Sequence, residues 1–188
     1  MLKSTALLTD RYELTMVQAA RRSGLAGRNC VFEVFSRQVP AGRRYGVVAG
    51  TGRLLDEIKE FRFGSEELEW LAAAKVVDTE TIDYLANFKF TGDIWGYREG
   101  DAYFAYSPVL VVEAPFEQGV LLETLILSIM NYDTAVASAA SRMRSAAGSR
   151  YLAEMGGRRT NEQAAVAAAR AAYIAGFDAT SNLEAGRS

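Results

Sequence analysis

Two adjacent arginines, Arg158 and Arg159, are the residues whose type and spacing point most directly to chemistry. A guanidinium group is planar, always charged and able to make two parallel hydrogen bonds to a carboxylate or a phosphate. The pair directly follows Gly156 and Gly157, and two consecutive glycines favour a loop over regular structure. The pattern therefore predicts a loop that binds a planar anion. A solvated arginine pair without a ligand fits the same local pattern.

A short strand, a helix and a second strand are predicted to hold this loop. Tyr151–Glu154 carries apolar residues and precedes the glycines, whereas 161–175 is rich in strong helix formers. Gly176 stands where a helix commonly ends, and Phe177–Asn182 is short enough for the second strand. Such a unit is a parallel βαβ crossover, in which functional groups gather at the carboxyl ends of the strands. The arginine pair would then lie at that edge.

The stretch from Gly156 onward resembles the nicotinate phosphoribosyltransferase family, and three further segments share the resemblance. Members of that family carry a Phe-Gly-x-Arg-Arg loop, an alanine-rich helix and a Gly-Phe-Asp-x-Thr-Ser-Asn segment. The matching residues here are Gly156, Arg158, Arg159, Ala171–Ile174, Gly176–Asp178, Thr180–Asn182, Ala185–Gly186, Leu8–Met16, Phe32–Arg37, Leu121–Thr124 and Asn131. Four collinear segments over nearly the whole chain are more specific than any one of them. In one departure, Met155 occupies the position of the family's usual Phe, which commonly stacks on the pyridine ring.

The resemblance implies an activity and a set of ring-binding residues. Relatives form nicotinate mononucleotide and pyrophosphate from nicotinate and phosphoribosyl pyrophosphate, with coupled ATP hydrolysis, in NAD biosynthesis. Tyr12 matches a tyrosine that stacks on the pyridine ring, usually across a dimer interface, although a core or interface aromatic without a ligand fits the position too. Arg158 is expected to clamp the nicotinate carboxylate or a phosphate. Asn182 matches a position that holds an acid in nicotinamide-using relatives, and a neutral Asn does not repel a carboxylate.

The same resemblance assigns phosphate-binding and supporting roles. Arg37 matches an arginine that reaches the diphosphate of phosphoribosyl pyrophosphate, in its own or the partner's site, and a surface arginine at a strand end is the alternative. Arg159 is also expected to contact phosphate. Asp10 and Asp178 are expected to support the site, and for Asp10 a helix cap is the simpler role. Mg²⁺ and ATP are the expected cofactors, without identifiable metal ligands, and a homodimer with shared sites is the expected assembly.

We expect an α/β fold in which an α+β amino-terminal domain at 1–133 precedes the first units of an irregular, parallel α/β barrel at 134–188. An eight-stranded barrel typically takes about 250 residues, so the barrel is expected to be truncated here. The sequence contains no histidine, and the family's histidine, phosphorylated during ATP coupling, is expected beyond Ser188. The catalytic residue therefore remains unknown, and residues 1–188 alone are expected to be inactive.

Composition narrows the classes of function. The net charge of −2 gives no support for nucleic-acid binding, so local arginines must meet anionic substrates. The single Cys30 excludes an internal disulfide and fits a reducing compartment, and the lack of histidine argues against a zinc site. The first eight residues lack the long apolar core of a signal peptide, and no apolar run reaches 18 residues. We therefore expect a cytoplasmic protein without a membrane span.

Hydrophobic periodicity and capping residues predict the remaining elements. Asp10 and Glu13 have the spacing of a capping box at the start of a helix that ends at Gly24. Strands are expected at 30–35, 45–49, 93–97, 102–106 and 109–114, and helices after Gly50, from a Ser65 cap, from Thr79, at 116–131 and at 134–147. Glu123 falls among the apolar residues of helix 116–131, where a buried carboxylate needs a partner.

Two other functions stay open. A related phosphoribosyltransferase could use nicotinamide or quinolinate; the neutral Asn182 argues against the first, and the Thr9-Asp10-x-Tyr12 start argues against the second. A truncated, non-catalytic chain that only dimerises or binds a ligand is the alternative from a different class. A Gly-Thr-x-x-His segment and glycine-rich phosphate loops after Ser188 would distinguish the enzyme from this alternative.

Overall fold

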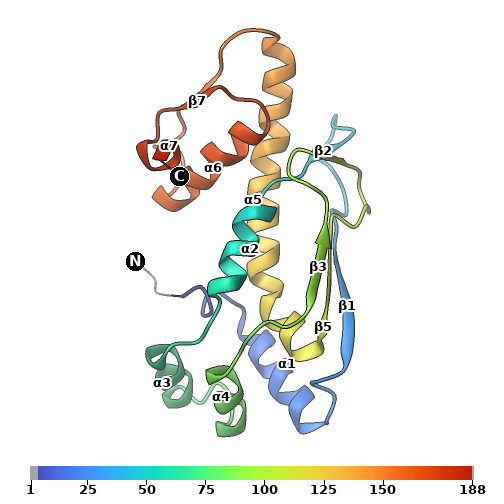
Figure 1. Ribbon diagram of the computed structural model, residues 1–188, viewed down its shortest axis with the longest axis vertical. Helices are drawn as coiled ribbons and strands as arrows, with labels where there is room; N and C mark the ends of the chain where they lie inside the picture. Colours follow the sequence, from blue (N-terminus) through green and yellow to red (C-terminus); the bar gives the residue numbers. More distant parts are fainter. Residues whose placement is uncertain (1–3, 188) are drawn as a thin grey trace. The chain divides into compact units, whose positions relative to one another are not determined.

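The computed structural model describes residues 4–187, in which short strands alternate with helices (Figure 1). Residues 1–3, part of the segment considered for a signal peptide, lie outside the described residues, as does Ser188. The helices are α1 Arg11–Arg22, α2 Thr51–Glu60, α3 Ser65–Ala73, α4 Thr79–Ala86, α5 Phe116–Ala147, α6 Glu162–Ile174 and α7 Leu183–Arg187. The strands are β1 Asn29–Val34, β2 Gly46–Val47, β3 Asp93–Gly96, β4 Ala102–Tyr103, β5 Leu110–Pro115, β6 Ala153–Glu154 and β7 Ala179–Thr180. This mixture of helices and strands confirms the predicted α/β class.

The chain forms two compact units, each assembled from separate stretches of sequence. The first unit contains the described residues up to Val34, then Leu54–Trp95 and Leu110–Ser128. The second contains Phe35–Arg53, Gly96–Val109 and the described residues from Ile129 onward. The predicted division at 133–134 concerns the start of a barrel, and it stays a prediction.

A three-stranded sheet has the order β1-β5-β3, and its antiparallel pair β1 and β5 belongs to the first unit. β1 and β5 pair along the whole length of both strands, with Phe32 opposite Val112. α5 begins directly after β5, and the rings of Phe32 and Phe116 lie with centroids 6.4 Å apart. A Cβ atom at Gly119 would lie 2.2 Å from the Phe32 ring. β1 therefore packs against α5 at a point where only glycine leaves enough room.

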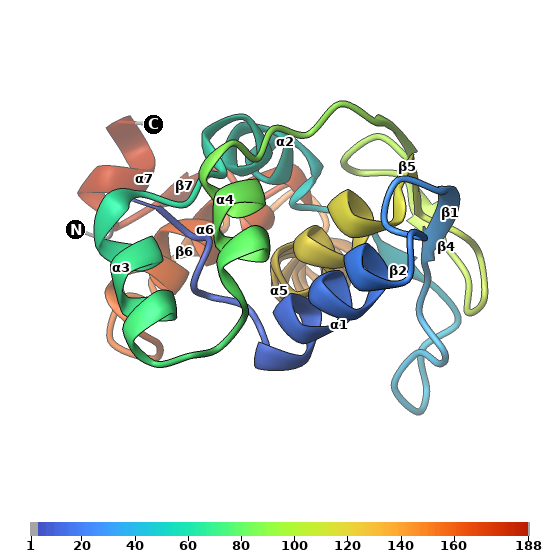
Figure 2. The same ribbon diagram turned by 90° about the horizontal axis from the view of Figure 1, so that it is seen from below.

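Helix α1 lies beside the first half of α5 (Figure 2). α1 buries Leu14 and Val17, as the spacing of its apolar residues requires. At the carboxyl end of α1, Arg21 binds the Glu117 carboxylate at 2.8 Å. The Arg21 guanidinium also lies 4.5 Å from the centroid of the Tyr84 ring in α4. A cation over an aromatic face is attracted to it, so Arg21 holds three helices of this unit together.

The second unit contains two small sheets and the second half of α5. β2 and β4 pair antiparallel, whereas β6 and β7 pair parallel. Val47, Ala49, Ala137 and Ala171 form a small buried core in this unit. Alanine side chains let the backbones of neighbouring elements approach closely, which gives the alanine-rich sequences of α5 and α6 a packing role.

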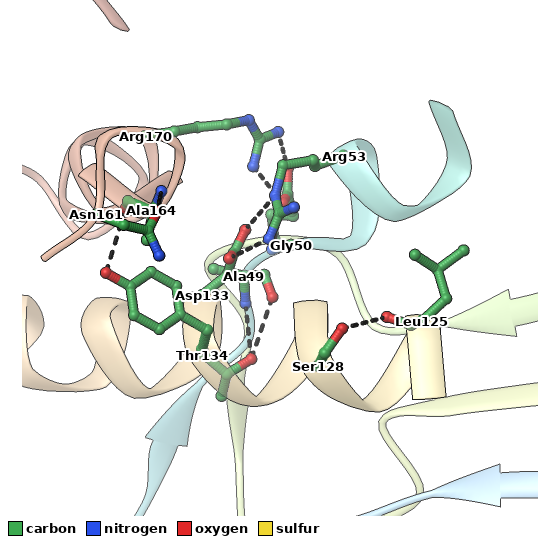
Figure 3. A network of polar contacts seen from close by, with 12 residues as sticks. Ala49, Gly50, Arg53, Leu125, Ser128, Asp133, Thr134, Asn161, Ala164 and Arg170 are labelled. Atoms are coloured by element: carbon green, nitrogen blue, oxygen red, sulfur yellow. Dashed lines mark hydrogen bonds and ion pairs between the residues drawn. The ribbon is translucent and has the colours of Figure 1, made fainter. Parts of the chain in front are cut away.

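Helix α5 runs without interruption from Phe116 to Ala147, where the sequence predicted two helices. Asn131 lies at the predicted break. The polar side chains of Asp133 and Thr134, which follow it, form hydrogen bonds with residues of neighbouring elements. Asp133 is fully buried and binds Arg53, and the hydroxyl of Thr134 donates to the carbonyl of Ala49 at 3.1 Å (Figure 3). The two-helix prediction was wrong because these partners, distant in sequence, remove the cost of placing polar residues in the middle of a buried helix.

Within residues 4–187, α5 is the helix that is long and apolar enough to cross a membrane by length and composition alone. Half of its most apolar stretch is nevertheless buried inside the protein. Leu121, Leu125 and Ile129 are among its buried side chains. A buried core helix passes the same test, so α5 is weak evidence for a span, and the expectation of a protein without one stays a prediction.

Four local predictions about capping and burial differ from the structure. Asp10 occupies the N-cap position of α1, but its side chain makes no capping hydrogen bond. Glu13 does not complete a capping box, because its carboxylate is buried and binds Thr124 of α5. Helix α3 begins after an N-cap at Gly64, so Ser65 is its first helical residue. Glu123 is exposed rather than buried, because it lies on the opposite side of α5 from the core-facing leucines.

Candidate functional site

The predicted βαβ unit is present in the second unit, and it brings two predicted binding segments to one edge. β6 and β7 are parallel, with Glu154 opposite Thr180. Between them, α6 begins after Asn161, whose side chain caps it, and ends before Gly176, whose φ is 96°. Parallel strands point the same way, so the loop after β6 and the residues after β7 share an edge. Local sequence signals predicted this arrangement correctly.

Glu154 ties the ends of the two strands together. Its carboxylate accepts hydrogen bonds from the Thr180 hydroxyl, at 2.9 Å, and from the backbone N–H of Gly156. Its carbonyl accepts a hydrogen bond from the N–H of Ser181 at 2.9 Å. A Cβ atom at Gly156 would lie 2.6 Å from this carboxylate, so a larger residue there would displace the Glu154 side chain. Sequence reasoning missed Glu154; a carboxylate that ends a strand just before two glycines was the available signal.

Arg158 and Arg159 lie in the exposed turn that Glu154 holds. The backbone N–H of Arg159 donates to the carbonyl of Gly156 at 2.8 Å, which closes the turn. Within the part of the chain that the structure describes, neither guanidinium group makes an ion pair. Two adjacent cations without an acidic partner favour an incoming anion. Met155, beside them, is 74% exposed, and its effect on ring stacking stays a prediction.

Asn182 lies two residues after the end of β7 and caps the short helix α7. Its side-chain oxygen accepts a hydrogen bond from the N–H of Ala185 at 3.0 Å. Its backbone N–H donates to the Thr180 hydroxyl at 3.0 Å. With the oxygen engaged, the side chain offers its NH₂ group, which only donates hydrogen bonds. A group of this kind suits a carboxylate, which only accepts them.

Asp178 makes structural contacts within the same unit. Its carboxylate accepts a hydrogen bond from the N–H of Leu152 at 2.8 Å and pairs with Arg144 of α5 at 3.1 Å. Arg144 also donates to the carbonyls of Gly176, at 3.3 Å, and Arg150, at 2.5 Å. The two side chains therefore fix where β6 and β7 begin, at the edge opposite the arginine loop. Any support that Asp178 gives to the candidate site would be indirect, through its effect on the positions of β6 and β7.

Arg37 lies in an exposed bend after β1 and belongs to the second unit. No acid among residues 4–187 forms an ion pair with it. Its predicted contact with phosphate stays a prediction. Among the same residues, no group of three or more Asp, Glu, Cys or His side chains is placed to hold a metal ion. The described residues therefore do not fit a Mg²⁺ site built from protein carboxylates alone.

Tyr12 and Asp10 lie at the start of α1, in the first unit. The Tyr12 side chain is 44% exposed, so its ring is accessible to a ligand. A hydrogen bond to Glu123 of α5 is the main reason why the pKa of the Tyr12 hydroxyl rises to about 12. The phenol is therefore neutral at physiological pH and donates to the Glu123 carboxylate. Its predicted stacking on a ring stays a prediction.

Glu13 is the buried carboxyl group next to Tyr12, and its side chain is 0% exposed. It accepts hydrogen bonds from the backbone N–H of Thr124 at 3.0 Å and from the Thr124 hydroxyl at 2.5 Å. The hydroxyl of Thr9 contacts its second oxygen. Burial raises the pKa of Glu13 to about 7, although the Thr124 hydrogen bonds lower it and the charges of Glu123 and Asp10 raise it further. The sequence marked Glu13 only as a possible cap.

A second buried acid lies in the second unit, beside the start of α2. The Asp133 carboxylate binds Arg53 through two hydrogen bonds, of 2.7 and 3.2 Å (Figure 3). Nearby, Glu99 binds Arg170 at 2.6 and 2.7 Å and accepts a hydrogen bond from the N–H of Gly50 at 2.7 Å. Burial raises the pKa of Glu99, but Arg170 and the backbone N–H groups outweigh it and leave the pKa below its usual value. These acids are already paired, so the network is structural.

Comparison with known proteins finds a matching family model and several relatives of similar sequence. Residues 7–131 match the family described as the nicotinate phosphoribosyltransferase (NAPRTase) N-terminal domain. A nicotinate phosphoribosyltransferase of Mycobacterium tuberculosis is 63% identical over 181 residues, which is 96% of this chain and 40% of that protein. One from Bacillus subtilis is 36% identical over 185 residues, 98% of this chain and 38% of that protein.

A solved structure shares the fold as well as the sequence. The crystal structure of human nicotinic acid phosphoribosyltransferase superposes with a TM-score of 0.87 at 31% sequence identity. The match covers 95% of this chain and 37% of the human chain. The chain thus spans about 40% of the length of the curated relatives that it matches.

Proposed function

This chain belongs to the nicotinate phosphoribosyltransferase family, and from that membership we propose that the protein expressed from its whole coding sequence is a nicotinate phosphoribosyltransferase. It would form nicotinate mononucleotide and pyrophosphate from nicotinate and phosphoribosyl pyrophosphate, in NAD biosynthesis. The proposal concerns the whole protein, because the relatives that carry this name are more than twice as long as the matched region.

The observation that carries the proposal is the shared edge of β6 and β7. Arg158 and Arg159 stand after one strand and Asn182 after the other, with Glu154 bonded to both segments. The edge offers an amide NH₂ and two guanidinium groups that form no ion pair within residues 4–187, while the Glu154 carboxylate is committed to the turn. A small aromatic carboxylate is an anion of the size and hydrogen-bonding character that such donors suit.

The chemistry asks the protein to position two reactants rather than to move many protons. The pyridine nitrogen is already a nucleophile, and displacement at the anomeric carbon of the ribose develops positive charge on the sugar as pyrophosphate leaves. Holding nitrogen and carbon in line, and stabilising the leaving group, supplies the rate enhancement. We assign the nicotinate carboxylate to Arg158 and Asn182, the ring to Tyr12, and the phosphates to Arg37 and Arg159.

Other parts of the proposal rest on the family resemblance. We propose that ATP hydrolysis is coupled to the reaction, that the protein acts in the cytoplasm, and that a homodimer shares residues between its sites. Mg²⁺ would neutralise phosphate charge when bound, but the described residues supply no cluster of acids for it, so no step is assigned to it. Asp10 and Asp178 would hold the elements that carry the binding residues.

The test is an assay of nicotinate mononucleotide formation, with and without ATP, and with nicotinamide or quinolinate in place of nicotinate. We expect product from nicotinate, more of it with ATP, and little from the other two pyridines. In the same protein, Arg158→Ala should raise the KM for nicotinate by about 10- to 100-fold, because a bidentate charged contact is lost. Arg150→Ala is the matched control, since this exposed arginine makes one long side-chain hydrogen bond, of 3.5 Å. No product from nicotinate, or equal losses in both variants, would count against the proposal.

A further inference from the structure

Two consecutive residues of α1 meet two consecutive residues of α5. Glu13 accepts hydrogen bonds from both the N–H and the hydroxyl of Thr124, at 3.0 and 2.5 Å. One residue earlier on each helix, the Tyr12 hydroxyl hydrogen-bonds to Glu123. Successive residues of a helix point about 100° apart. Glu13 therefore lies in the interior of the helix pair while Tyr12 stands at its accessible rim.

The contact between Glu13 and Thr124 is a directional pair of hydrogen bonds rather than nonspecific apolar packing. A carboxylate with two hydrogen bonds to one residue fixes both the rotation of α1 and its position along α5. It lies in the first turn of α1, whereas the ion pair between Arg21 and Glu117 of α5 lies at the carboxyl end of α1. Without Glu13, the turn that carries Tyr12 would lose its buried hydrogen bonds to α5.

We propose that Glu13 is a positioning residue for Tyr12: through its hydrogen bonds to Thr124 it sets the place of the Tyr12 ring, and so the fit of the aromatic substrate. This inference rests on the proposed function, in which Tyr12 binds the pyridine. Glu13 does not touch the substrate. Its effect therefore falls on the affinity for nicotinate more than on the rate of the chemical step.

The charges around Glu13 favour its neutral form in this role. Asp10, which precedes α1, and Glu123, on α5, are the charged groups that act on it, and the neutral Tyr12 hydroxyl bonds to Glu123. A protonated Glu13 still accepts from Thr124 through one oxygen and can donate from the other to the Thr9 hydroxyl. A glutamine side chain reproduces both interactions, so Glu13→Gln is the conservative variant.

The test compares nicotinate kinetics in variants of the protein expressed from its whole coding sequence. Glu13→Ala should raise the KM for nicotinate by about 10-fold while kcat stays within about 3-fold, because binding geometry rather than chemistry is lost. Glu13→Gln should restore the wild-type KM. Glu117→Gln is the matched control, because it loosens α1 from α5 at the far end; its KM should stay within about 2-fold. An unchanged KM in Glu13→Ala, or an equal rise in Glu117→Gln, would overturn the inference.

A second measurement does not depend on activity. In protein labelled with 3-fluorotyrosine, the ¹⁹F resonance of Tyr12, assigned with Tyr12→Phe, should shift in Glu13→Ala and stay in place in Glu117→Gln. If Glu13→Ala does not fold, Thr124→Val, which removes one of the two hydrogen bonds, replaces it in both experiments. A shifted resonance in a protein that forms no nicotinate mononucleotide would refute the proposed function and leave the positioning role standing. An unmoved resonance would refute the positioning role by itself.

Discussion

Replacing Glu13 by glutamine should change how the stability of the protein depends on pH. Burial raises the pKa of Glu13 from 4.5 to about 7 in the folded chain. Between these values the folded state binds a proton that the unfolded state has released. The stabilisation by this bound proton is therefore fully present below pH 4.5, and it is lost as the pH rises through about 7. Glutamine has no proton to lose, so its contribution to stability is the same at every pH.

The size of the effect follows from the two pKa values. One unit of pKa difference corresponds to about 1.4 kcal/mol, and a rise from 4.5 to about 7 lowers the free energy of unfolding by about 2.5 kcal/mol between pH 5 and pH 8. Every other titratable group is shared by both proteins, so the difference between wild type and Glu13→Gln isolates Glu13.

Urea denaturation of both proteins at pH 5, 6, 7 and 8 measures this difference. The wild type should be at least as stable as Glu13→Gln at pH 5, and the variant should gain on it steadily as the pH rises. Glu117→Gln serves as a control, because it removes a different α1–α5 contact and should not alter the slope in this way. Stability curves of wild type and Glu13→Gln that stay parallel from pH 5 to pH 8 would refute a raised pKa at Glu13.

Two further substitutions test the packing. Arg53→Met should lower the free energy of unfolding by about 3 kcal/mol in urea denaturation, because it leaves the buried carboxylate of Asp133 without its charged partner. Converting Asp133 to asparagine in the same chain should recover part of that loss, and no recovery would contradict this account. Gly119→Ala should cost about 1–3 kcal/mol, because its Cβ would lie 2.2 Å from the Phe32 ring. Adding Phe32→Leu should reduce the cost of the alanine; an unchanged cost would place the strain elsewhere.

Elements whose signals are local could be predicted well from the sequence. The βαβ unit was found because Asn161 and Gly176 mark the two ends of an alanine-rich helix; in the structure Asn161 is its N-cap, and Gly176, with a φ of 96°, follows its C-cap. The break predicted in α5 had no such basis. Asp133 lies between the two predicted helices, and its partner Arg53 lies 80 residues away, where no local window reveals it. Contacts over that separation depend on the tertiary fold.

The candidate site also contains features that local sequence signals predicted and features that they did not. The exposed loop that carries Arg158 and Arg159 followed from residue types and glycines, and the roles predicted for Tyr12 and Asn182 came from family resemblance. The buried and exposed acids of the first unit were exchanged in the prediction: Glu123 was expected inside, and Glu13 is the buried one. Which face of a helix is covered depends on its neighbours, and in α5 the apolar residues are too many to single out one face.

The cap that Asn182 makes on α7 bears on how substrate preference could change in evolution. Capping uses only the side-chain oxygen, through the N–H of Ala185 at 3.0 Å. Aspartate caps a helix about as well as asparagine, so exchanging the two leaves this turn intact. The same exchange replaces a hydrogen-bond donor with a negative charge at the edge where the substrate would sit. Under the proposed function, this one position would switch the preference between acidic and neutral pyridines at little cost to folding.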